Sequence, residues 1–243
     1  MKITVIIPCY NMEAYIERAI KSVLDQTFQN WQLIVVDDGS TDNSWSIINK
    51  TLGHSSRVLG IRTDNHGVAA ARNLAIERAE GEWILPLDAD DWLRPDALYQ
   101  FAVTIWSNKN SDLIVPWVHH TSSDKDWVNK RTYKGYESLK VQNCLPNSCC
   151  YRRMGWFLAG GYRDGTMYED WEFWLRLLKP DSKVVSLPIP VIEYTVRPGS
   201  RVKVAEKRHR EEVEIIKKLN PEIYGNALPH QGALYAGEVE EIR

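Results

Sequence analysis

Three carboxylates crowd one short stretch of the chain, "LPLDADDWLRP", at the end of an apolar run. Like charges that close repel one another, so Asp88, Asp90 and Asp91 cost stability unless a cation, backbone donors or water compensates them. Asp88 and Asp90 lie two residues apart at an expected strand end, so their side chains can point the same way. Such oxygens suit Mg²⁺ or Mn²⁺ bound together with substrate phosphates. A cap and turn before Pro95 is the structural alternative, and we favour it for Asp91 alone.

Two further acidic pairs stand at the ends of expected elements. Asp37 and Asp38 in "VVDDGSTDNS" follow an apolar strand, where an acid commonly hydrogen-bonds a nucleoside. Glu169 and Asp170 in "YEDWEFWLRL" begin an expected helix, where a purely structural cap and a functional acid carry equal weight. Neighbouring aromatic residues favour function, because together they could form an apolar wall on which sugars stack; burial in the core is the structural alternative. These residues are Trp156, Tyr162, Trp171, Phe173 and Trp174.

The first ninety residues alternate apolar runs with segments of helical period, which predicts an α/β fold with a parallel sheet covered by helices. The expected strands span 3–8, 31–38, 57–62 and 82–88, and the expected helices span 12–26, 41–52 and 67–81. In such sheets ligands lie beyond the carboxyl ends of the strands. Arg72 falls early in the third helix, whose amide end favours anions. Carboxylates, an arginine and a helix N-terminus are therefore expected at one edge.

The second half of the chain has a looser pattern. A helix is expected over 95–107, a strand over 112–118, a polar loop over 119–134, helices over 136–145 and from 168, a strand pair within 183–196, and a charged helix over 205–219. No internal repeat or long linker separates the halves, so we expect the second to pack on the first.

Composition excludes several classes of protein. The 243 residues are 44% hydrophobic, as in a globular protein with a real core, and the net charge of -2 gives no basic field for nucleic acid. Four cysteines follow no metal spacing and the N-terminus lacks signal-peptide order, which indicates a reduced, cytoplasmic protein. The longest apolar stretches fall short of the ~18 residues of a membrane span.

Several nucleotide-binding alternatives fit poorly. A dinucleotide-binding fold fails because "PCYNMEAY" contains no G-x-G-x-x-G. A receiver-type phosphoacceptor would have its acid pair at the end of the first strand. A nucleotidyltransferase is less favoured because no glycine-rich, arginine-containing loop follows that strand.

Four stretches, in order, resemble family 2 glycosyltransferases with the GT-A fold. They are "VIIPCYNMEAYIERAIKSVLDQTF", "VVDDGSTDNS", "NHGVAAARNLAIERAEGEWILPLDADD" and "YEDWEFWLRL". The resemblance covers about 3–200 and implies a Rossmann-like, mostly parallel sheet with helices on both faces and a smaller acceptor-binding C-terminal part. It divides the chain into a nucleotide-sugar-binding half (1–95), an acceptor-binding half (96–204) and a C-terminal helix and tail (205–243).

The resemblance also implies roles for single residues. The residues implied around the nucleotide are Pro8, Tyr10, Asn11 and Glu13 in the first loop, Asp38 on the base, and Arg72 near the base or diphosphate. Asp88 and Asp90 match the family's D-x-D, with Asp88 toward the ribose or metal and Asp90 as the direct ligand of Mn²⁺ or Mg²⁺. Asp170 matches the second acid of the E-D pair, the expected catalytic base, whose pKa burial would raise.

One stretch departs from the family pattern. Many members have a histidine in Y-R-x-H-x-x-S that completes the metal site, whereas "YTVRPGS" has Arg197 at that position and Thr195 at the usual arginine. The departure implies weaker metal affinity. It also leaves Arg197 to neutralise the diphosphate directly, since a guanidinium matches phosphate oxygens well, or to be an ordinary surface arginine.

The activity implied by the resemblance is inverting transfer from a nucleoside-diphosphate sugar, UDP favoured, to a hydroxyl of a glycan or lipid-linked acceptor. A non-catalytic nucleotide-sugar-binding scaffold is the alternative, which Arg197 supports and the intact acid pair opposes. The basic segment 201–219 offers peripheral contact with the inner face of an anionic membrane, but its acids favour a helix packed on the domain. A homodimer is left open.

Overall fold

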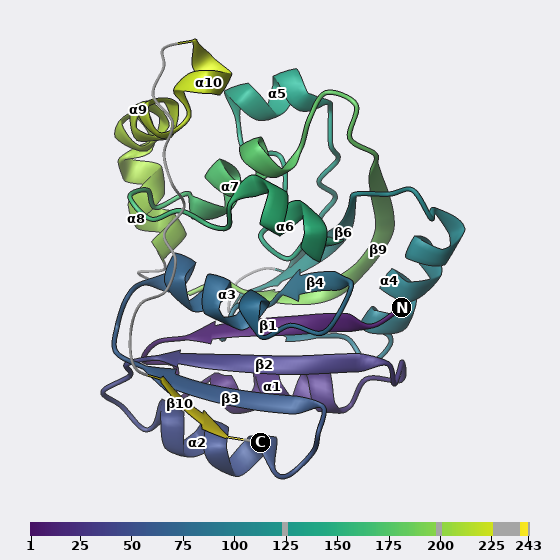
Figure 1. Cartoon of the computed structure of the whole chain (residues 1–243), viewed down its shortest axis with the longest axis vertical. Helices are drawn as coiled ribbons and strands as arrows, with labels where there is room; N and C mark the ends of the chain where they lie inside the picture. Colours follow the sequence, from purple (N-terminus) through teal and green to yellow (C-terminus); the bar gives the residue numbers. More distant parts are fainter. Residues whose placement is uncertain (123–125, 198–200, 226–238, 243) are drawn as a thin grey trace.

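One mixed sheet runs through the molecule, with helices on both of its faces, in this computed structural model (Figure 1). It describes residues 1–122, 126–197, 201–225 and 239–242. The strands are β1 (Ile3–Cys9), β2 (Trp31–Asp38), β3 (Val58–Thr63), β4 (Trp83–Pro86), β5 (Trp92–Leu93), β6 (Leu113–Thr121), β7 (Trp127–Asn129), β8 (Cys150–Arg152), β9 (Val184–Thr195) and β10 (Val239–Ile242). The helices are α1 (Ile16–Leu24), α2 (Ser44–Leu52), α3 (Val68–Glu77), α4 (Ala97–Ser107), α5 (Tyr136–Val141), α6 (Arg153–Ala159), α7 (Glu169–Leu177), α8 (Arg201–Lys207), α9 (His209–Leu219) and α10 (Pro221–Tyr224).

The first four strands lie where the sequence predicts them, and they pair in parallel in the order β3-β2-β1-β4. The strand order changes direction at β1, so the loops after β1 and β4 diverge. In α/β sheets a ligand crevice is expected at such a point, beyond the carboxyl ends of the strands. The arrowheads of β1 and β2 lie on the same side in Figure 1. The loops that carry the predicted site residues therefore meet at one edge.

The apolar runs become strands because both faces of the sheet are covered. Every residue of β2 is buried, as expected for a parallel strand between two helical layers. Along β1, Val5 and Ile7 pack in the core that contains Ile16 and Ile20 of α1. Ile6 packs on the opposite face with residues of α3. This alternation confirms the predicted α/β class with helices on both faces.

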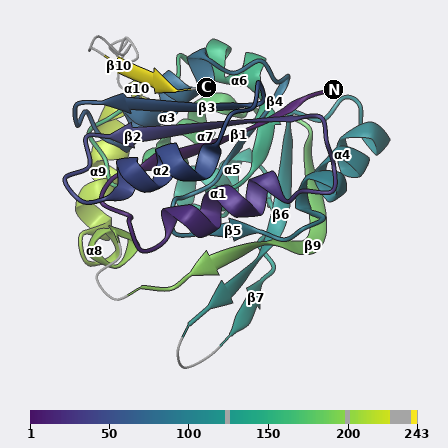
Figure 2. The ribbon, with the colours of Figure 1, turned by 90° about the horizontal axis from the view of Figure 1, so that it is seen from below.

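Two predictions for the second half are wrong. The strand pair expected within 183–196 is one strand, β9, which pairs in parallel with β6 through register shifts around Trp117. The polar loop expected over 119–134 is partly sheet, because β6 continues to Thr121 and β7 pairs back onto it. Figure 2 shows β7 and the end of β9 projecting from the body of the molecule. Cross-strand ring stacking between His120 and Trp127 stabilises this projection, although its composition is polar.

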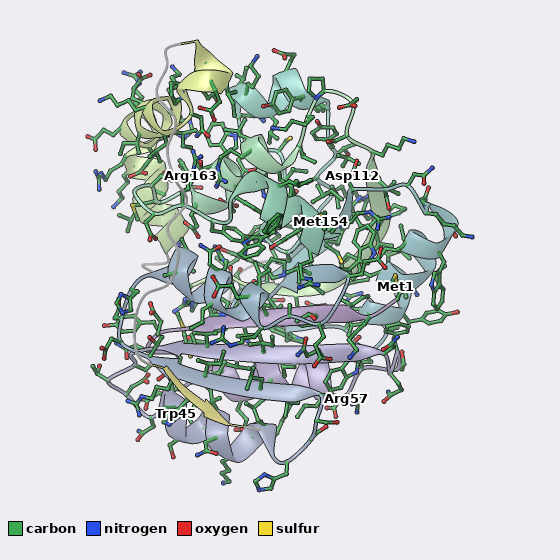
Figure 3. All side chains as sticks on the ribbon, in the orientation of Figure 1. Met1, Trp45, Arg57, Asp112, Met154 and Arg163 are labelled. Carbon is green, nitrogen blue, oxygen red and sulfur yellow. The ribbon has the colours of Figure 1, made fainter. Side chains whose placement is uncertain are left out.

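The charged C-terminal segment packs on the domain, as its acids predicted. It forms two helices, α8 and α9, rather than one. Glu212 in α9 is buried, and its Oε2 accepts hydrogen bonds from the Thr166 hydroxyl (2.8 Å) and the Met167 amide (2.7 Å). Arg163, labelled in Figure 3, donates to the carbonyl of Leu219 at 2.9 Å. These bonds hold α9 against the loop that leads into α7.

The C-terminal strand was not foreseen from the sequence. β10 pairs antiparallel with β3 at the edge of the sheet, so residues from the end of the chain lie beside a strand of its first half (Figure 1). The remainder of the predicted tail, 226–238, lies outside the described residues. Within the described residues, no helix combines the length and the apolarity needed to cross a bilayer.

Replacing Glu212, a buried acid of α9, should destabilise the protein more than replacing Glu211, an exposed acid of the same helix. Glu212→Ala leaves the Thr166 hydroxyl and the Met167 amide without their acceptor, and we expect it to cost about 2–3 kcal/mol of unfolding free energy. Glu211, whose side chain is 67% exposed, pairs with Arg208 at the surface. Glu211→Ala should change stability by no more than about 0.5 kcal/mol. Urea unfolding measures both, and equal losses would contradict the packing of α9.

Candidate active site

The loops after β1 and β2 hold each other in place. Asn11 adopts a positive φ of 53°, and its side-chain oxygen accepts the amide hydrogen of Thr41 at 2.9 Å. The Glu13 carboxylate accepts hydrogen bonds from the Asn43 backbone (3.0 Å) and side chain (2.8 Å). Tyr10 projects from this frame with 45% of its surface exposed. Asn11 and Glu13 therefore brace the first loop, and Tyr10 is the exposed ring at its start.

The carboxylate of Asp38 binds the backbone of the loop that leads into α3. Its two carboxylate oxygens accept hydrogen bonds from the backbone amides of His66 and Gly67, both at 2.9 Å. The side chain lies at the carboxyl end of β2, beside the end of β1 where Pro8 lies. Pro8 and Asp38 thus sit at the crevice edge, and Asp38 also fixes the backbone at the start of α3.

Arg72 joins two distant acids. Its side chain in α3 is buried, with Nη2 3.0 Å from Asp88 Oδ1 and Nη1 2.8 Å from Glu169 Oε1. The guanidinium carbon also lies 5.4 Å from the ring centroid of Tyr162. A buried guanidinium between two carboxylates compensates both charges. The end of β4 and the start of α7 are thereby held together at the crevice.

Each acid of the "DADD" cluster has its own partner. Asp91 is buried and accepts the Thr195 amide at 2.8 Å, which fits the structural role predicted for it alone. Asp90 Oδ2 lies 2.6 Å from both Nε and Nη2 of Arg197. Burial, and then the charge of Asp88, raises the pKa of Asp90 and of Asp91. Separate cations and amides therefore compensate the negative charges of the cluster, and this reduces the repulsion among its three carboxylates.

The donor set around Asp88 and Asp90 fits a hard cation that is shared with a substrate. Both donors to Asp88, from Arg72 and Asn147, reach Oδ1, and both contacts of Arg197 reach Asp90 Oδ2. The Asp88 side chain is 35% exposed. Among the described residues, no group of three or more acids, histidines or cysteines could hold a metal. Two carboxylates completed by phosphate oxygens match the way Mg²⁺ is usually bound.

Asp170 is the second residue of α7 and follows Glu169, the residue that pairs with Arg72. Its Oδ1 accepts the Trp171 amide at 2.8 Å, and its Oδ2 accepts the Asn143 side-chain amide at 3.1 Å. Burial, with the charge of Glu169 added, raises the pKa of Asp170 to about 6, against the lowering effect of Arg72 and these hydrogen bonds. The predicted direction of this shift is confirmed. A carboxylate with that pKa is a competent proton acceptor near neutral pH.

The predicted aromatic wall for sugar stacking is wrong. Its members Tyr162, Trp171, Phe173 and Trp174 are no more than 1% exposed, and Tyr162 stacks on Phe173 with centroids 4.0 Å apart. Trp156 is only partly buried, and its indole N–H donates a hydrogen bond to the side chain of Asn73. These rings fill the core under the site, because α7 packs directly on the sheet.

Sequence reasoning missed the amides that orient the acids. Asn143 and Asn147 lie in the same loop between α5 and β8, and they donate to Asp170 and Asp88 respectively. Two asparagines in a short loop were the available signal, but their partners lie 27 and 59 residues away. Glu169, which the sequence suggested only as the neighbour of Asp170 in an acidic pair, is the second ion-pair partner of Arg72.

Comparison with known proteins decides the family. The family model for Glycosyl transferase family 2 matches residues 4–160, more than half of the chain. The chain belongs to glycosyl transferase family 2. The matched range of this glycosyltransferase includes Asp38, Arg72, Asp88 and Asp90 and ends ahead of α7.

Relatives share parts of their length with it. An uncharacterized glycosyltransferase of Haemophilus influenzae is 46% identical over 97 residues, covering 40% of this chain and 39% of the relative. Glycosyltransferase GlyG of Streptococcus pneumoniae is 37% identical over 150 residues, 59% of this chain and 48% of the relative. Chondroitin synthase of Escherichia coli is 38% identical over 183 residues, 72% of this chain and 26% of the relative. The matches thus span from about a quarter to about half of these relatives.

Solved structures share the fold. Staphylococcus aureus TarS in complex with UDP-GlcNAc superposes with a TM-score of 0.76 at 23% identity, covering 94% of this chain and 68% of that one. The mannosyltransferase PcManGT from Pyrobaculum calidifontis, in complex with GDP-Man and Mn²⁺, gives 0.70 at 18% identity, covering 93% and 65%. The predicted GT-A fold is confirmed by this likeness.

The raised pKa of Asp170 should appear in the pH dependence of stability. The folded protein keeps this proton up to about pH 6, whereas the unfolded chain releases it near 3.8. Unfolding therefore becomes easier as pH rises through that window, by up to about 3 kcal/mol, and the effect levels off above it. The unfolding free energy of the wild type should fall relative to Asp170→Asn between pH 4 and 7, as followed by urea titration. The exposed acid Asp25 provides the control Asp25→Asn, and a pH-independent difference for Asp170→Asn would contradict the raised pKa.

Proposed function

We propose that this glycosyltransferase moves a sugar from a nucleoside-diphosphate sugar, with UDP favoured, to a hydroxyl of a glycan or lipid-linked acceptor, with inversion at the anomeric carbon. The observation that carries the proposal is the Asp88–Arg72–Glu169 link, which joins the loop of the acid cluster to the first turn of α7, where Asp170 follows Glu169. The chondroitin and hyaluronan synthases among the relatives support a place in polysaccharide or glycoconjugate synthesis.

The proposal divides the chain by task. Residues 1–95 bind the donor, with Pro8, Tyr10 and Asp38 at the base and ribose on the frame braced by Asn11 and Glu13, and 96–204 bind the acceptor. The UDP-GlcNAc complex of TarS supports the choice of uridine, since that protein shares the fold over 94% of this chain. We place the reaction in the cytoplasm at the inner face of the membrane, where lipid-linked and polymer acceptors reside.

The departing diphosphate needs positive charge near it. In this proposal Asp88 and Asp90 hold Mn²⁺ or Mg²⁺, which when bound stabilises the charge that develops on the leaving group. The Mn²⁺ in the PcManGT complex supports this choice. Arg197 lies at the same carboxylate, 2.6 Å from Asp90, so its guanidinium is placed to contribute a further charge to the diphosphate. Arg72, proposed to lie near the base or diphosphate, also orients Asp88 through their ion pair at 3.0 Å.

Asp170 removes the acceptor proton. The hydroxyl oxygen attacks the anomeric carbon as its proton passes to the Asp170 carboxylate, and the bond from that carbon to the diphosphate oxygen breaks on the opposite face. A single displacement of this kind inverts the configuration and gives a β-linked product from an α-linked donor. Asn143 and the Trp171 amide keep the carboxylate oriented.

Asp170→Asn should separate binding from chemistry. We expect transfer to fall by roughly 10²–10⁴-fold, because general-base assistance contributes that much, while UDP affinity stays within about twofold of the wild type. Initial rates with a panel of UDP-sugars and calorimetric UDP binding measure the two effects. Asp181→Asn, an exposed acid in the same half of the chain, should leave both unchanged. Near-normal transfer by Asp170→Asn, or an α-linked product by proton NMR, would exclude the assignment.

Nucleotide and metal should stabilise the protein together. We expect UDP with Mn²⁺ to raise the melting temperature more than GDP, dTDP or CDP, because a ligand bound only to the folded state contributes about 2.7 kcal/mol at a hundredfold excess over its Kd. Asp90→Asn should abolish the Mn²⁺ dependence, whereas Arg197→Ala should retain it with weaker UDP binding.

The same series distinguishes the alternatives. A metal-dependent shift without transfer of any sugar would indicate a nucleotide-sugar-binding scaffold. Release of pyrophosphate from a nucleoside triphosphate would indicate a nucleotidyltransferase. No shift with any of the four nucleotides would overturn the donor site itself.

A further inference from the structure

Three aromatic rings form a ladder across neighbouring strands. Trp127 of β7 lies directly opposite His120 of β6, and His120 lies opposite Tyr194 of β9. The rings of His120 and Trp127 are stacked, with centroids 4.7 Å apart and an interplanar angle of 13°. The rings of His120 and Tyr194 are also 4.7 Å apart but tilted by 46°. We call these three residues the aromatic ladder, and its strands form the projection seen in Figure 2.

The inner end of the ladder lies at the acid cluster. The inner ring of the ladder belongs to Tyr194, the residue directly before Thr195 in β9. The next residue, Thr195, donates its amide to Asp91 and its hydroxyl to the carbonyl of Asp90. The ladder therefore starts beside the carboxylates proposed for the donor and runs outward from them.

The outer end of the ladder is an exposed, uncharged ring surface. Trp127 is 41% exposed. Burial, with the charges of Arg131 and His119, lowers the pKa of His120 to about 4, so the imidazole under Trp127 is neutral at physiological pH. A flat neutral ring surface of this kind suits the apolar face of a sugar ring.

The strand that carries Trp127 is also tied to the loop that orients the acids. Arg131 follows β7 and donates to the carbonyl of Leu145 at 2.8 Å. Leu145 lies between Asn143 and Asn147, the amides that bind Asp170 and Asp88. The chain from Trp127 to Asn143 thus connects the ladder to the amide that binds the proposed base, Asp170.

We propose that the aromatic ladder is the acceptor subsite, and that its occupant is a pyranose ring of a glycan chain stacked on Trp127. The inference rests on the proposed function, because the glycan chain bound at this subsite would carry the hydroxyl that Asp170 deprotonates. The rings beside Asp170 that the sequence suggested for stacking are buried, so acceptor stacking needs another surface. Trp127 offers it, at the end of a ladder that begins at the acid cluster.

A matched pair of tryptophans tests the subsite. Trp106 of α4 is 52% exposed and packs edge-on against Phe28. Its helix lies on the opposite side of the molecule from the arrowheads of β1 and β2 (Figure 1). An array of oligosaccharides built from glucose, galactose, N-acetylhexosamines and glucuronic acid, probed with protein preloaded with UDP and Mn²⁺, measures glycan binding. We expect Trp127→Ala to weaken binding at least tenfold, Trp127→Phe to retain most of it, and Trp106→Ala to leave it unchanged.

The other outcomes are separable. Equal losses in Trp127→Ala and Trp106→Ala, or no binding of the wild type to any glycan, would overturn the subsite. A change of oligomeric state on Trp127→Ala in sedimentation, without loss of glycan binding, would assign the ladder to a second copy of the chain instead. UDP binding by calorimetry should be the same in all variants, and its absence in the wild type would count against the proposed function rather than against the ladder.

Discussion

The buried guanidinium of Arg72 is the interaction on which the site depends. It lies 3.0 Å from Asp88 and 2.8 Å from Glu169, and so ties the loop after β4 to the first turn of α7. Removing either acid would leave a buried charge with half of its compensation, a change that typically costs several kcal/mol. Because Asp170 follows Glu169 directly, this ion-paired link also connects the turn that carries Asp170 to the loop of the acid cluster. The carboxylates look unfavourably crowded in the sequence. One of them, Asp88, nevertheless helps to join the two halves of the chain through Arg72.

Hydrogen bonds also hold together the loops at the carboxyl edge of the sheet. Asn11 and Glu13 bind the backbone of the loop after β2, and Asp38 binds the backbone at the start of α3. Polar side chains at the carboxyl ends of the strands thus satisfy the amides of neighbouring loops before any ligand arrives. Because these loops are already ordered, binding a ligand to them costs little additional conformational entropy. The same bonds explain why the side chain left projecting from this frame is Tyr10, which is 45% exposed.

Local pattern was sufficient for the fold of the first half but not for the site. The four parallel strands could be predicted because buried strands are short apolar runs separated by helices of clear period, as in "WQLIVVDD". The aromatic wall could not, because whether Trp171 or Trp174 faces a ligand or the core depends on where α7 packs. Asn143 and Asn147 were missed since their partners are distant in sequence, and β7 was missed because its stability comes from cross-strand rings rather than from composition. The nucleotide contacts of Pro8, Tyr10 and Asp38 stay predictions.

Arg197 shows how a single departure from the family pattern changes the electrostatics of the site. A neutral histidine donates a lone pair to a metal, whereas a guanidinium has none and brings a positive charge. Arg197 uses that charge on Asp90, at 2.6 Å, so a cation that approaches Asp90 must share the carboxylate with it or displace it. Sharing weakens the cation's hold, and displacement frees a guanidinium next to the place where the diphosphate would lie. Either way, the energy of binding a metal and the energy of binding an anion are linked through one carboxylate, so each should depend on the other more strongly here than where a histidine completes the site.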